Sequence, residues 1–483
     1  MQYTLLCDCC RHARGSWRSA VAQRAGGQLR TFVNMRVSEM DAERLSTLLA
    51  SLPALSSLSR LILPVCNGAA LATTQAFMIG AARAIGRYPC LQHLDLRIQL
   101  ADRLADQLPE AFGQLLAEAC SLQRLSIEIE VVSRTAFRPR WPVTSTTQLM
   151  AGLAGMSQLR TLTLEVGKVV AEGMLPACMS RLVQLTSLRL SGLRGLRCAP
   201  GWARLPSLAC LRIHDCMFAG IGEEVLPGMG ALATLTSLAV QGCPSICALP
   251  TSVWQLTQLC CLSHVNWDRK PARLRRGEVP LSGVPTSAPC FASLTSLSLP
   301  GQDLVAFPLG ILAATRLTHL CLSRCCFEHL PEGMSVLTAL ETLELGRYAA
   351  PKMIGGGFDA QALGSLAGFP NLQSLKFASC SVQFCPSIQA TAAHPRLTRL
   401  QLDTAFPAMG ASCRAFLAFV ITLCCSMSAQ TCLFCTKASL TARGAGTVAA
   451  SGEPCGRWVS LCMALTSAAP QTRTSPPPTR SRR

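Results

Sequence analysis

One complete structural unit can be read in the stretch Leu317-Thr-His-Leu320-Cys-Leu322-Ser-Arg-Cys325-Cys-Phe327-Glu-His-Leu330-Pro331, which precedes Leu337 and a new start at Leu340. Its first half has the form L-x-x-L-x-L, in which apolar and variable residues alternate as in a β-strand with one buried face. Its second half places leucines at helical spacing after Leu-Pro. This indicates a turn into a short helix or 3-10 segment, because proline is tolerated in a first turn. The unit therefore predicts a strand, a turn and a short helix.

The strand half of this unit recurs along the chain, with isoleucine, valine or phenylalanine allowed at the last apolar position. Thirteen copies begin at Leu58, Leu91, Leu122, Leu159, Leu185, Leu208, Leu235, Leu259, Leu294, Leu317, Leu340, Leu372 and Leu397. The copy at Leu259 is degenerate, because it ends on His264. One short strand cannot bury its apolar face alone, whereas stacked parallel strands bury a continuous core. We expect one strand per copy, with Leu320, Leu322 and Leu343 buried and the residues between them exposed.

These units resemble the leucine-rich-repeat family over roughly residues 50–405. With their Leu-Pro turns, which recur at Pro176 and Pro250, they resemble most the intracellular repeats of plant resistance-type receptors and of Ras-group scaffold proteins. The resemblance implies an α/β fold: a leucine-rich-repeat solenoid, curved like a horseshoe, with a parallel strand in each repeat. Short helices, 3-10 segments or loops are expected on its convex side.

The family often places an asparagine or cysteine three residues after the last leucine of the strand. The resemblance implies that this side chain turns inward and bonds the backbone of the neighbouring coil. The residues at this position are Cys216, Cys243, Cys325 and Cys380, with Gln302 once. A buried thiol suits the role as a small group that forms weak hydrogen bonds. We expect these cysteines to be buried and reduced.

The repeats divide the chain into four segments. Residues 1–50 form a basic N-terminal segment in which 40–49 could be a capping helix, and residues 51–405 form the solenoid. Residues 406–435 are an apolar cap for the last repeat. The alternative is a membrane segment, because Ala415–Cys435 has 21 residues without a charge. Residues 436–483 lack periodicity and are typical of a disordered basic tail.

Charge and cysteine content limit the partner and the compartment. The net charge of +18 favours partners with acidic surfaces. The 27 cysteines follow no disulfide spacing and no signal-like leader precedes them, which favours a reducing interior. We therefore expect a cytoplasmic protein. The alternatives are a cytoskeletal location such as the ciliary axoneme, or a membrane anchored through Ala415–Cys435.

The motifs of common enzyme classes are missing from the sequence. It has no phosphate-binding P-loop, no H-E-x-x-H zinc motif, no G-x-S-x-G elbow and no protein-kinase motif set. The pairs Cys7–Cys10 and Cys432–Cys435 lie near opposite ends of the chain, whereas a structural zinc site needs four ligands together. The sequence therefore predicts no enzyme, no cofactor and no metal site.

The variable strand positions should line the concave surface of the solenoid. Arg189 and Arg212 occupy the same position in consecutive copies, so they should lie side by side. We take as the candidate binding residues Arg189, Arg212, His214, Arg324 and Arg347. Arginine can grip a carboxylate or phosphate through two hydrogen bonds, which favours a partner with an acidic patch. The alternative is that both arginines are solvated or pair with a nearby acid such as Asp215.

The hypothesis for function is a non-catalytic, protein-binding scaffold or adaptor that uses its concave face. One alternative is a regulatory or receptor-like subunit of the defence or signalling type that lacks a nucleotide-binding domain, and another is a membrane-anchored adaptor. Two basic insertions, Arg134–Trp141 and Trp267–Arg276, could contact nucleic acid. We interpret them as solvated loops, because charge patches are common on surfaces.

Overall fold

The structure is a computed structural model of the chain, and it describes residues 3–6, 29–33, 59–66, 82–83, 85–86, 88–101, 110–119, 121–132, 140–141, 143–167, 170–171, 174–199, 202–218, 226–246, 248–265, 284–302, 304, 307–325, 331–347, 368–378 and 396–403. The chain divides into two compact units, Met1–Leu322 and Ser323–Arg483, which we call unit 1 and unit 2.

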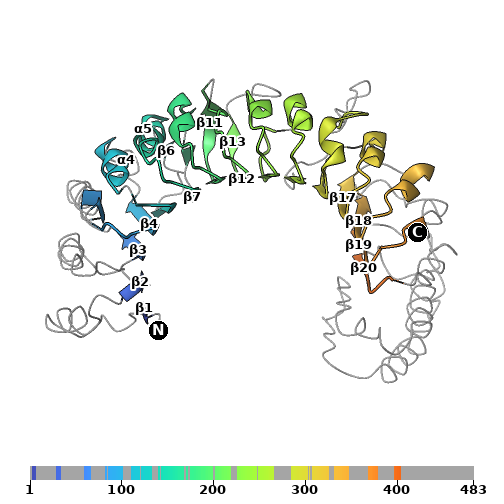
Figure 1. The fold of residues 1–483 in the computed structure, drawn as a ribbon, viewed down its shortest axis with the longest axis horizontal. Helices are drawn as coiled ribbons and strands as arrows, with labels where there is room; N and C mark the ends of the chain where they lie inside the picture. The colour runs from blue at the N-terminus through green and yellow to red at the C-terminus, as the bar shows by residue number, and fades with distance from the viewer. Residues whose placement is uncertain are drawn as a thin grey trace, which may run out of the picture. The chain divides into compact units, whose positions relative to one another are not determined.

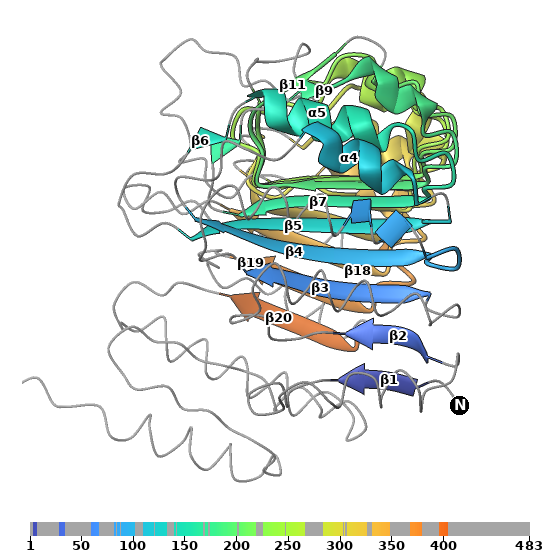
Figure 2. The ribbon, with the colours of Figure 1, turned by 90° about the vertical axis from the view of Figure 1, so that its left-hand side faces the viewer.

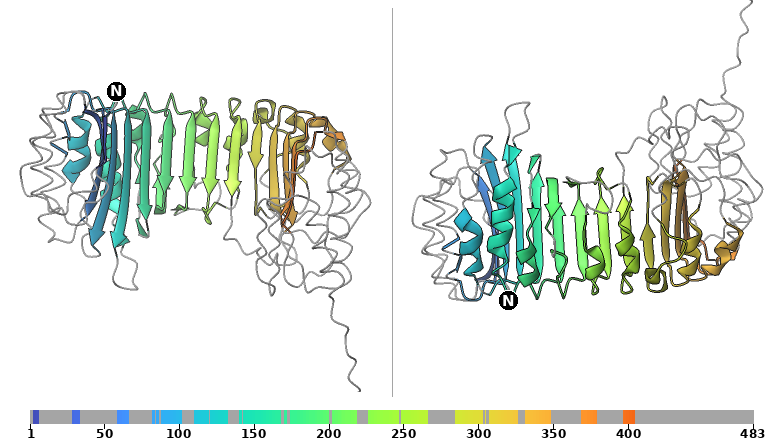
Figure 3. Two further views of the ribbon diagram at one scale, coloured as in Figure 1. Left: turned by 90° about the horizontal axis from the view of Figure 1, so that it is seen from below. Right: turned by 90° about the horizontal axis from the view of Figure 1, so that it is seen from above.

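Unit 1 is built on one parallel sheet, the main sheet, whose strands follow one another in chain order. The order is β1 (Tyr3–Leu6), β2 (Leu29–Val33), β3 (Arg60–Cys66), β4 (His93–Ala101), β5 (Arg124–Val132), β7 (Thr161–Gly167), β10 (Ser187–Ser191), β12 (Cys210–His214), β14 (Ser237–Gln241), β15 (Cys261–Val265), β16 (Ser296–Ser298) and β17 (His319–Cys325). The repeats pair in register, so that Leu188 lies opposite Leu211 and Leu211 lies opposite Leu238. Figure 3 shows the strands of unit 1 running parallel to one another.

The described helices of unit 1 cover one side of this sheet (Figures 1 and 2). They are the α-helices α4 (Glu110–Ala117) and α5 (Val143–Leu153) and the 3-10 helices η3 (Ala177–Arg181), η5 (Met229–Ala231), η6 (Thr251–Gln255), η7 (Pro289–Ala292) and η8 (Leu309–Ala313). Pro176 and Pro250 precede η3 and η6, which confirms the turn into a short helix that the Leu-Pro steps predict. In unit 1 the strands lie on the inner side of a curve, and we call their uncovered surface the concave face (Figure 1).

Two small parallel sheets flank the main sheet, and no sequence pattern predicts them. One contains β9 (Met174–Leu175), β11 (Arg194–Cys198) and β13 (Met217–Phe218), and the other contains β6 (Arg140–Trp141) and β8 (Val170–Ala171). The backbone N–H of Phe218, at the end of β13, donates to the Ser245 hydroxyl at 2.7 Å. The hydroxyl satisfies an edge donor that would otherwise need a further strand.

The described leucines of the copies in unit 1 form its core. Leu320 and Leu322 are 1% and 0% exposed, as the repeat predicts. Cys321, the residue between them, is half-buried instead of exposed, and its partner on the neighbouring strand β16 is Ser298. His264 fills the last apolar position of the degenerate copy and is buried, and its Nε2 lies 3.1 Å from the carbonyl oxygen of Ile246. This contact explains how a polar residue replaces an apolar one there.

The residues that follow the strands turn inward as the resemblance implies. Cys216, Cys243 and Cys325 are buried and free of disulfides. The Sγ of Cys243 lies 3.9 Å from the Ile213 carbonyl of the preceding repeat, and the Nε2 of Gln302 donates to the His264 carbonyl at 3.1 Å. Both contacts join neighbouring coils. Cys380 lies outside the described residues.

Unit 2 continues the same pattern. It contains η9 (Glu332–Val336) followed by β18 (Thr342–Arg347), β19 (Ser374–Ala378) and β20 (Arg399–Asp403), which pair in parallel. Leu343 is fully buried, as predicted, whereas Glu344 is half-buried. The Nζ of Lys376 lies 3.0 Å from a carboxylate oxygen of Glu344, its partner across the strands.

The α/β architecture expected from the repeat is confirmed, and the strand stack begins earlier than the expected boundary at residue 51. β1 and β2 continue the main sheet, with Phe32 opposite Leu61. The L-x-x-L-x-L pattern misses β2 because Phe32 and Asn34 stand at its second and third apolar positions. The proposed cap at 40–49 and the segments 406–435 and 436–483 lie outside the described residues. Within the described part of the chain, no helix is both long and apolar enough to span a membrane.

Candidate functional site

The concave face carries the side chains that alternate with the buried leucines. One row of it, which we call the central row, joins residues that are direct partners across neighbouring strands. Its members are Thr163, Arg189, Arg212, Ala239, Ser263, Ser298 and Cys321. Apart from the two arginines, the row consists of small or uncharged residues. The charge of this row is therefore concentrated at β10 and β12.

Arg189 and Arg212 lie side by side, because they are partners in the pairing of β10 with β12. Neighbouring strands are about 4.8 Å apart, so both guanidinium groups can reach one ligand. Arg212 is exposed, and Arg189 is half-buried. The Nε atom of Arg189 is buried and has no hydrogen-bond partner. Within the described part of the chain, neither arginine forms an ion pair.

His214 lies two residues beyond Arg212 on β12, so its side chain is on the same face. Its Nε2 atom is buried and lacks a hydrogen-bond partner. Burial lowers the pKa of His214, and so do the positive charges of Arg189 and Arg212, whereas Asp215 and Glu165 oppose them. The imidazole is therefore neutral at neutral pH. Ser191, two residues beyond Arg189 on β10, is the cross-strand partner of His214, so Arg189 and His214 lie on the same face of neighbouring strands.

Asp215, the expected alternative partner of the arginines, is held by the turn after β12. Its φ of 50° lies in the left-handed region, and its backbone N–H donates to the Gln241 carbonyl at 2.8 Å. Its carboxylate lies against Gly242, where a Cβ atom would be 2.1 Å from Oδ1. Among the described residues, no ion pair links Asp215 to Arg189 or Arg212.

The buried leucines in register, one strand per repeat and the inward residue after each strand together define the fold. The fold is that of a leucine-rich-repeat protein. No protein-family model matches the chain, and no curated protein matches it.

Several solved structures are similar to this chain. A leucine-rich-repeat protein of Leptospira interrogans has 19% identity and a TM-score of 0.49, over 82% of this chain and 89% of that chain. An internalin of Listeria monocytogenes has 11% identity and a TM-score of 0.40, over 81% and 94% of the two chains. The leucine-rich-repeat ectodomain of a plant membrane receptor kinase from Arabidopsis thaliana has 13% identity and a TM-score of 0.38, over 81% and 57%. These likenesses concern the fold alone, and the resemblance to resistance-type and Ras-group repeats stays a prediction.

The remaining candidate residues are not brought to this cluster by described contacts. Arg324, in the part of β17 beyond Leu322, and Arg347, in β18, belong to unit 2, and their side chains lie outside the described part of the structure. The basic insertion Trp267–Arg276 is also outside it. In the other insertion, Arg140 and Trp141 form β6 and pair with β8.

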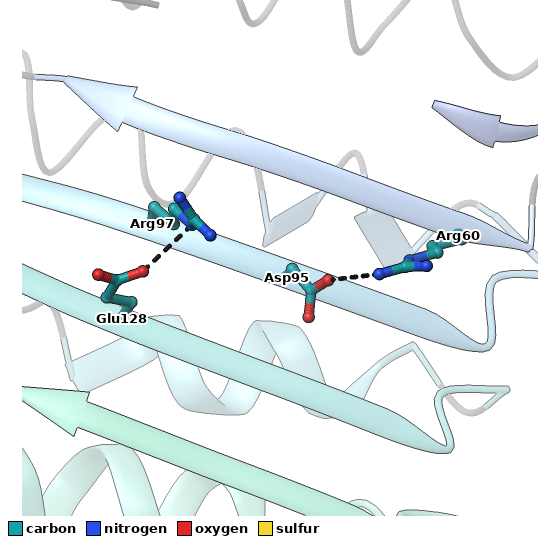
Figure 4. A network of polar contacts seen from close by, with 4 residues as sticks. All are labelled: Arg60, Asp95, Arg97 and Glu128. Carbon is teal, nitrogen blue, oxygen red and sulfur yellow. Dashed lines mark ion pairs between the residues drawn. The ribbon is translucent and has the colours of Figure 1, made fainter. Parts of the chain in front are cut away.

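The N-terminal part of the concave face contains ion pairs that the sequence analysis missed. Arg60 pairs with Asp95 at 3.5 Å, and Arg97 pairs with Glu128 at 3.1 Å, each across neighbouring strands (Figure 4). The signal was present at the second variable position of each long strand, one residue after the last leucine of the pattern. Reading that position in consecutive copies places Arg97 beside Glu128 and Glu128 beside Glu165.

The described residues contain no group of three or more histidine, cysteine or acidic side chains placed to hold a metal ion. Burial raises the pKa of the Cys243 thiol to about 11 and that of Cys198 to about 12. At neutral pH these thiols are protonated, which makes them poor nucleophiles. What the site offers chemically is a cationic surface with unpaired hydrogen-bond donors.

Proposed function

We propose that this protein is a non-catalytic scaffold that binds a partner protein through the concave face of unit 1. The observation that carries the proposal is the adjacent pair Arg189 and Arg212, which lacks an ion pair within the described residues although the arginines on β3 and β4 have one. Two unpaired guanidinium groups on neighbouring strands favour a partner with an acidic patch.

The surroundings of the arginine pair favour a macromolecular partner. On the β14 side, Ala239, Ser263 and Ser298 continue the central row. Small side chains leave the sheet surface open to close approach by a partner chain, whereas small-molecule sites are concave and largely apolar. A rigid sheet that presents charged and small side chains in rows also limits the entropy lost on binding. We infer a cytoplasmic adaptor whose effect on its partner comes from binding alone.

The test places a photo-crosslinking amino acid at either of two positions in the full-length chain. One position is Ser263 on the concave face, and the control is Ala177, which is exposed at the start of η3 on the helical side. We expect crosslinks to one partner from position 263 and none to that partner from position 177. Crosslinking of the partner from position 177 alone would place binding on the other side and overturn the proposal.

A second measurement tests the arginine pair. The double variant Arg189→Ala/Arg212→Ala should lose most of the crosslinked partner at physiological salt while keeping its thermal stability, since neither arginine has an ion-pair partner to lose among the described residues. The control is Arg124→Ala on β5, which removes one positive charge from the same face. Undiminished capture by the double variant would show that the binding surface lies elsewhere.

A further inference from the structure

Arg189, Arg212 and His214 form a cluster of hydrogen-bond donors, which we call the donor cluster. Arg189 and Arg212 are cross-strand partners, and His214 follows Arg212 by two residues on the same face. Two residues of a strand span about 6.7 Å, which is within the reach of an arginine side chain. The three groups can therefore converge on one ligand.

Two atoms of the donor cluster are left without a hydrogen bond in the free protein. They are the Nε of Arg189 and the Nε2 of His214, and both are buried. Buried polar atoms are nearly always satisfied, because an unmatched donor has lost its water and gained nothing. A ligand that brings oxygen atoms to this place would satisfy both, with the neutral imidazole in the tautomer that carries its proton on Nε2. The unmatched atoms therefore point to a ligand and not only to a solvated charge.

The acids nearest to His214 do not occupy this place. Glu165 on β7 and Asp215 after β12 both act on the charge of His214, yet no ion pair joins either of them to an arginine in the described residues. The carboxylate of Asp215 lies against Gly242. The contrast is with Arg97, whose guanidinium Nε lies 3.1 Å from Glu128. The donor cluster thus keeps its donors available to an external anion.

We propose that the donor cluster binds a phosphoryl group on a phosphorylated serine, threonine or tyrosine of the partner protein. This inference rests on the proposed function and names the chemistry of the partner. A carboxylate has two oxygens, and a single arginine satisfies both through its fork of donors. A phosphoryl group has three oxygens and nearly two negative charges, which matches two guanidinium groups and an imidazole.

A nucleic acid would also bring phosphates, but the face around the donor cluster is a poor match for it. A phosphodiester has one charge and two free oxygens, one oxygen fewer than the three donor groups could hold. Nucleic-acid surfaces of this kind add aromatic side chains on which bases stack. The neighbours along the central row are Thr163 on one side and Ala239 and Ser263 on the other, none of them aromatic. The surface therefore favours a phosphorylated protein segment.

The experiment measures binding of the full-length protein to arrays of degenerate peptides in three matched forms. The central residue is phosphorylated, replaced by glutamate, or unmodified, and the best sequences are then measured by fluorescence anisotropy. We expect the phosphorylated form to bind at least about tenfold more tightly than the glutamate form. Equal binding of the phosphorylated and glutamate forms would overturn the inference. Tighter binding of a single-stranded oligonucleotide than of any phosphopeptide would also overturn it.

Variants separate the contribution of each donor. Arg189→Ala and Arg212→Ala should each weaken phosphopeptide binding by about tenfold, and Arg189→Lys should not restore it, because lysine keeps the charge but lacks the Nε donor and the fork. His214→Ala should weaken binding of the phosphorylated form more than binding of the glutamate form, which reduces the preference for phosphate. Arg124→Ala on the same face is the control and should change neither.

The outcomes distinguish this inference from the proposed function. Loss of the crosslinked partner in the arginine variants, with no effect of phosphorylation, would overturn the phosphoryl site and leave the scaffold proposal standing. Retention of the partner in those variants would overturn both. A preference for phosphate that survives Arg189→Ala/Arg212→Ala would show that phosphate binds elsewhere on the protein.

Discussion

Two regions of unit 1 belong to the same sheet but differ in the length of their strands and in the type of helix that follows them. The strands β3, β4, β5 and β7 contain 7 to 9 residues, and the α-helices α4 and α5 accompany them. The strands β10, β12, β14 and β15 contain 5 residues each, and 3-10 helices of 3 to 5 residues accompany them. Figure 2 shows the long strands of the first region below α4 and α5.

The length of the repeat explains this difference. The copies that hold α4 and α5 begin at Leu91 and Leu122 and are 31 and 37 residues long, whereas the copies from Leu185, Leu208 and Leu235 are 23, 27 and 24 residues long. A 3-10 helix rises faster per residue than an α-helix and closes after three residues, so it fits a short return path. The repeated leucines therefore determine the strands of the sheet. The number of residues between one strand and the next determines which kind of helix can form.

The two regions also differ in how they use charge on the concave face. In the first, the arginines of β3 and β4 pair with acids on neighbouring strands. In the second, Arg189 and Arg212 lie beside each other, and the described residues provide no acid within ion-pair distance. The first region thus pairs two of its arginines with acids, whereas the arginine pair of the second region has no such partner among the described residues. Four experiments test this comparison.

The largest effect should come from replacing a buried leucine of the strands, a feature that both regions share. Leu320→Asp in β17 and Leu94→Asp in β4 should each lower the free energy of unfolding by roughly 4 kcal/mol or more, because each buries an unpaired charge. Urea denaturation followed by circular dichroism measures the loss. Ser298→Asp is the control, because its side chain is on the concave face. An unchanged curve for either leucine variant would contradict its place in the core.

The thiols of the second region should react slowly with alkylating reagents. Burial raises the pKa of Cys243 from the usual 9.0 to about 11, which lowers its thiolate fraction at pH 8 roughly a hundredfold. Cys216, which is buried at the same position of the preceding repeat, should behave alike. Mass spectrometry after iodoacetamide treatment gives the rates, with the exposed Cys90 and Cys261 as internal controls. Rapid labelling of Cys243 in the native protein would contradict the inward orientation of the cysteines that follow the strands.

The contact between the two α-helices belongs only to the first region. A Cβ atom on Gly152 in α5 would lie 2.6 Å from the backbone carbon of Gly113 in α4, so the helices must separate if either residue gains a side chain. We expect Gly152→Ala to lower the free energy of unfolding by about 2 kcal/mol, even though alanine favours a helix by about 1 kcal/mol over glycine. Differential scanning calorimetry measures the change.

The matched control for the helix contact is Gly86→Ala. Its added Cβ would meet the Cβ of Glu118 at 3.5 Å, which is an ordinary contact, so this variant should keep or raise stability. If Gly152→Ala were as stable as Gly86→Ala, the close approach of the helices would not be needed for the fold.

The smallest effect on stability should distinguish an arginine in an ion pair from one without an acidic partner. Arg97→Ala breaks an exposed ion pair with Glu128 and should lower the free energy of unfolding by about 0.5 kcal/mol, in line with other surface pairs. Arg212→Ala breaks no ion pair among the described residues and should leave stability unchanged while weakening ligand binding. Paired urea titrations in low and high salt measure both. A greater loss for Arg212→Ala would show that its charge is satisfied within the protein.

Much of the fold could be predicted because the repeat is a local pattern. The positions of Leu320, Leu322 and Leu343 in the core and the inward turn of Cys216 and Cys243 all depend on spacing within one copy. The strand at Leu29–Val33 was missed because two of its three apolar positions depart from the pattern. The close approach of Gly113 and Gly152 was missed because the two glycines lie in different copies.

The candidate site was only partly visible in the sequence. That Arg189 lies beside Arg212 follows from aligning consecutive copies, and the pairing of β10 with β12 agrees. The position of Asp215 against Gly242 depends on a left-handed turn, and the burial of the Nε of Arg189 depends on the strands around it. Neither property can be read from residue identity, because both depend on neighbours from other repeats.

The sequence by itself determined the strand, the turn and the register of each repeat, since an alternation of leucines can bury its apolar face in only one way. The tertiary structure alone decided which charges are satisfied. Arg97 and Arg189 are the same residue type on the same face, yet one has an acid on the next strand and the other has an arginine. The physical reason is that an ion pair or an unmatched donor depends on distances between repeats, and these exist only once the strands have stacked.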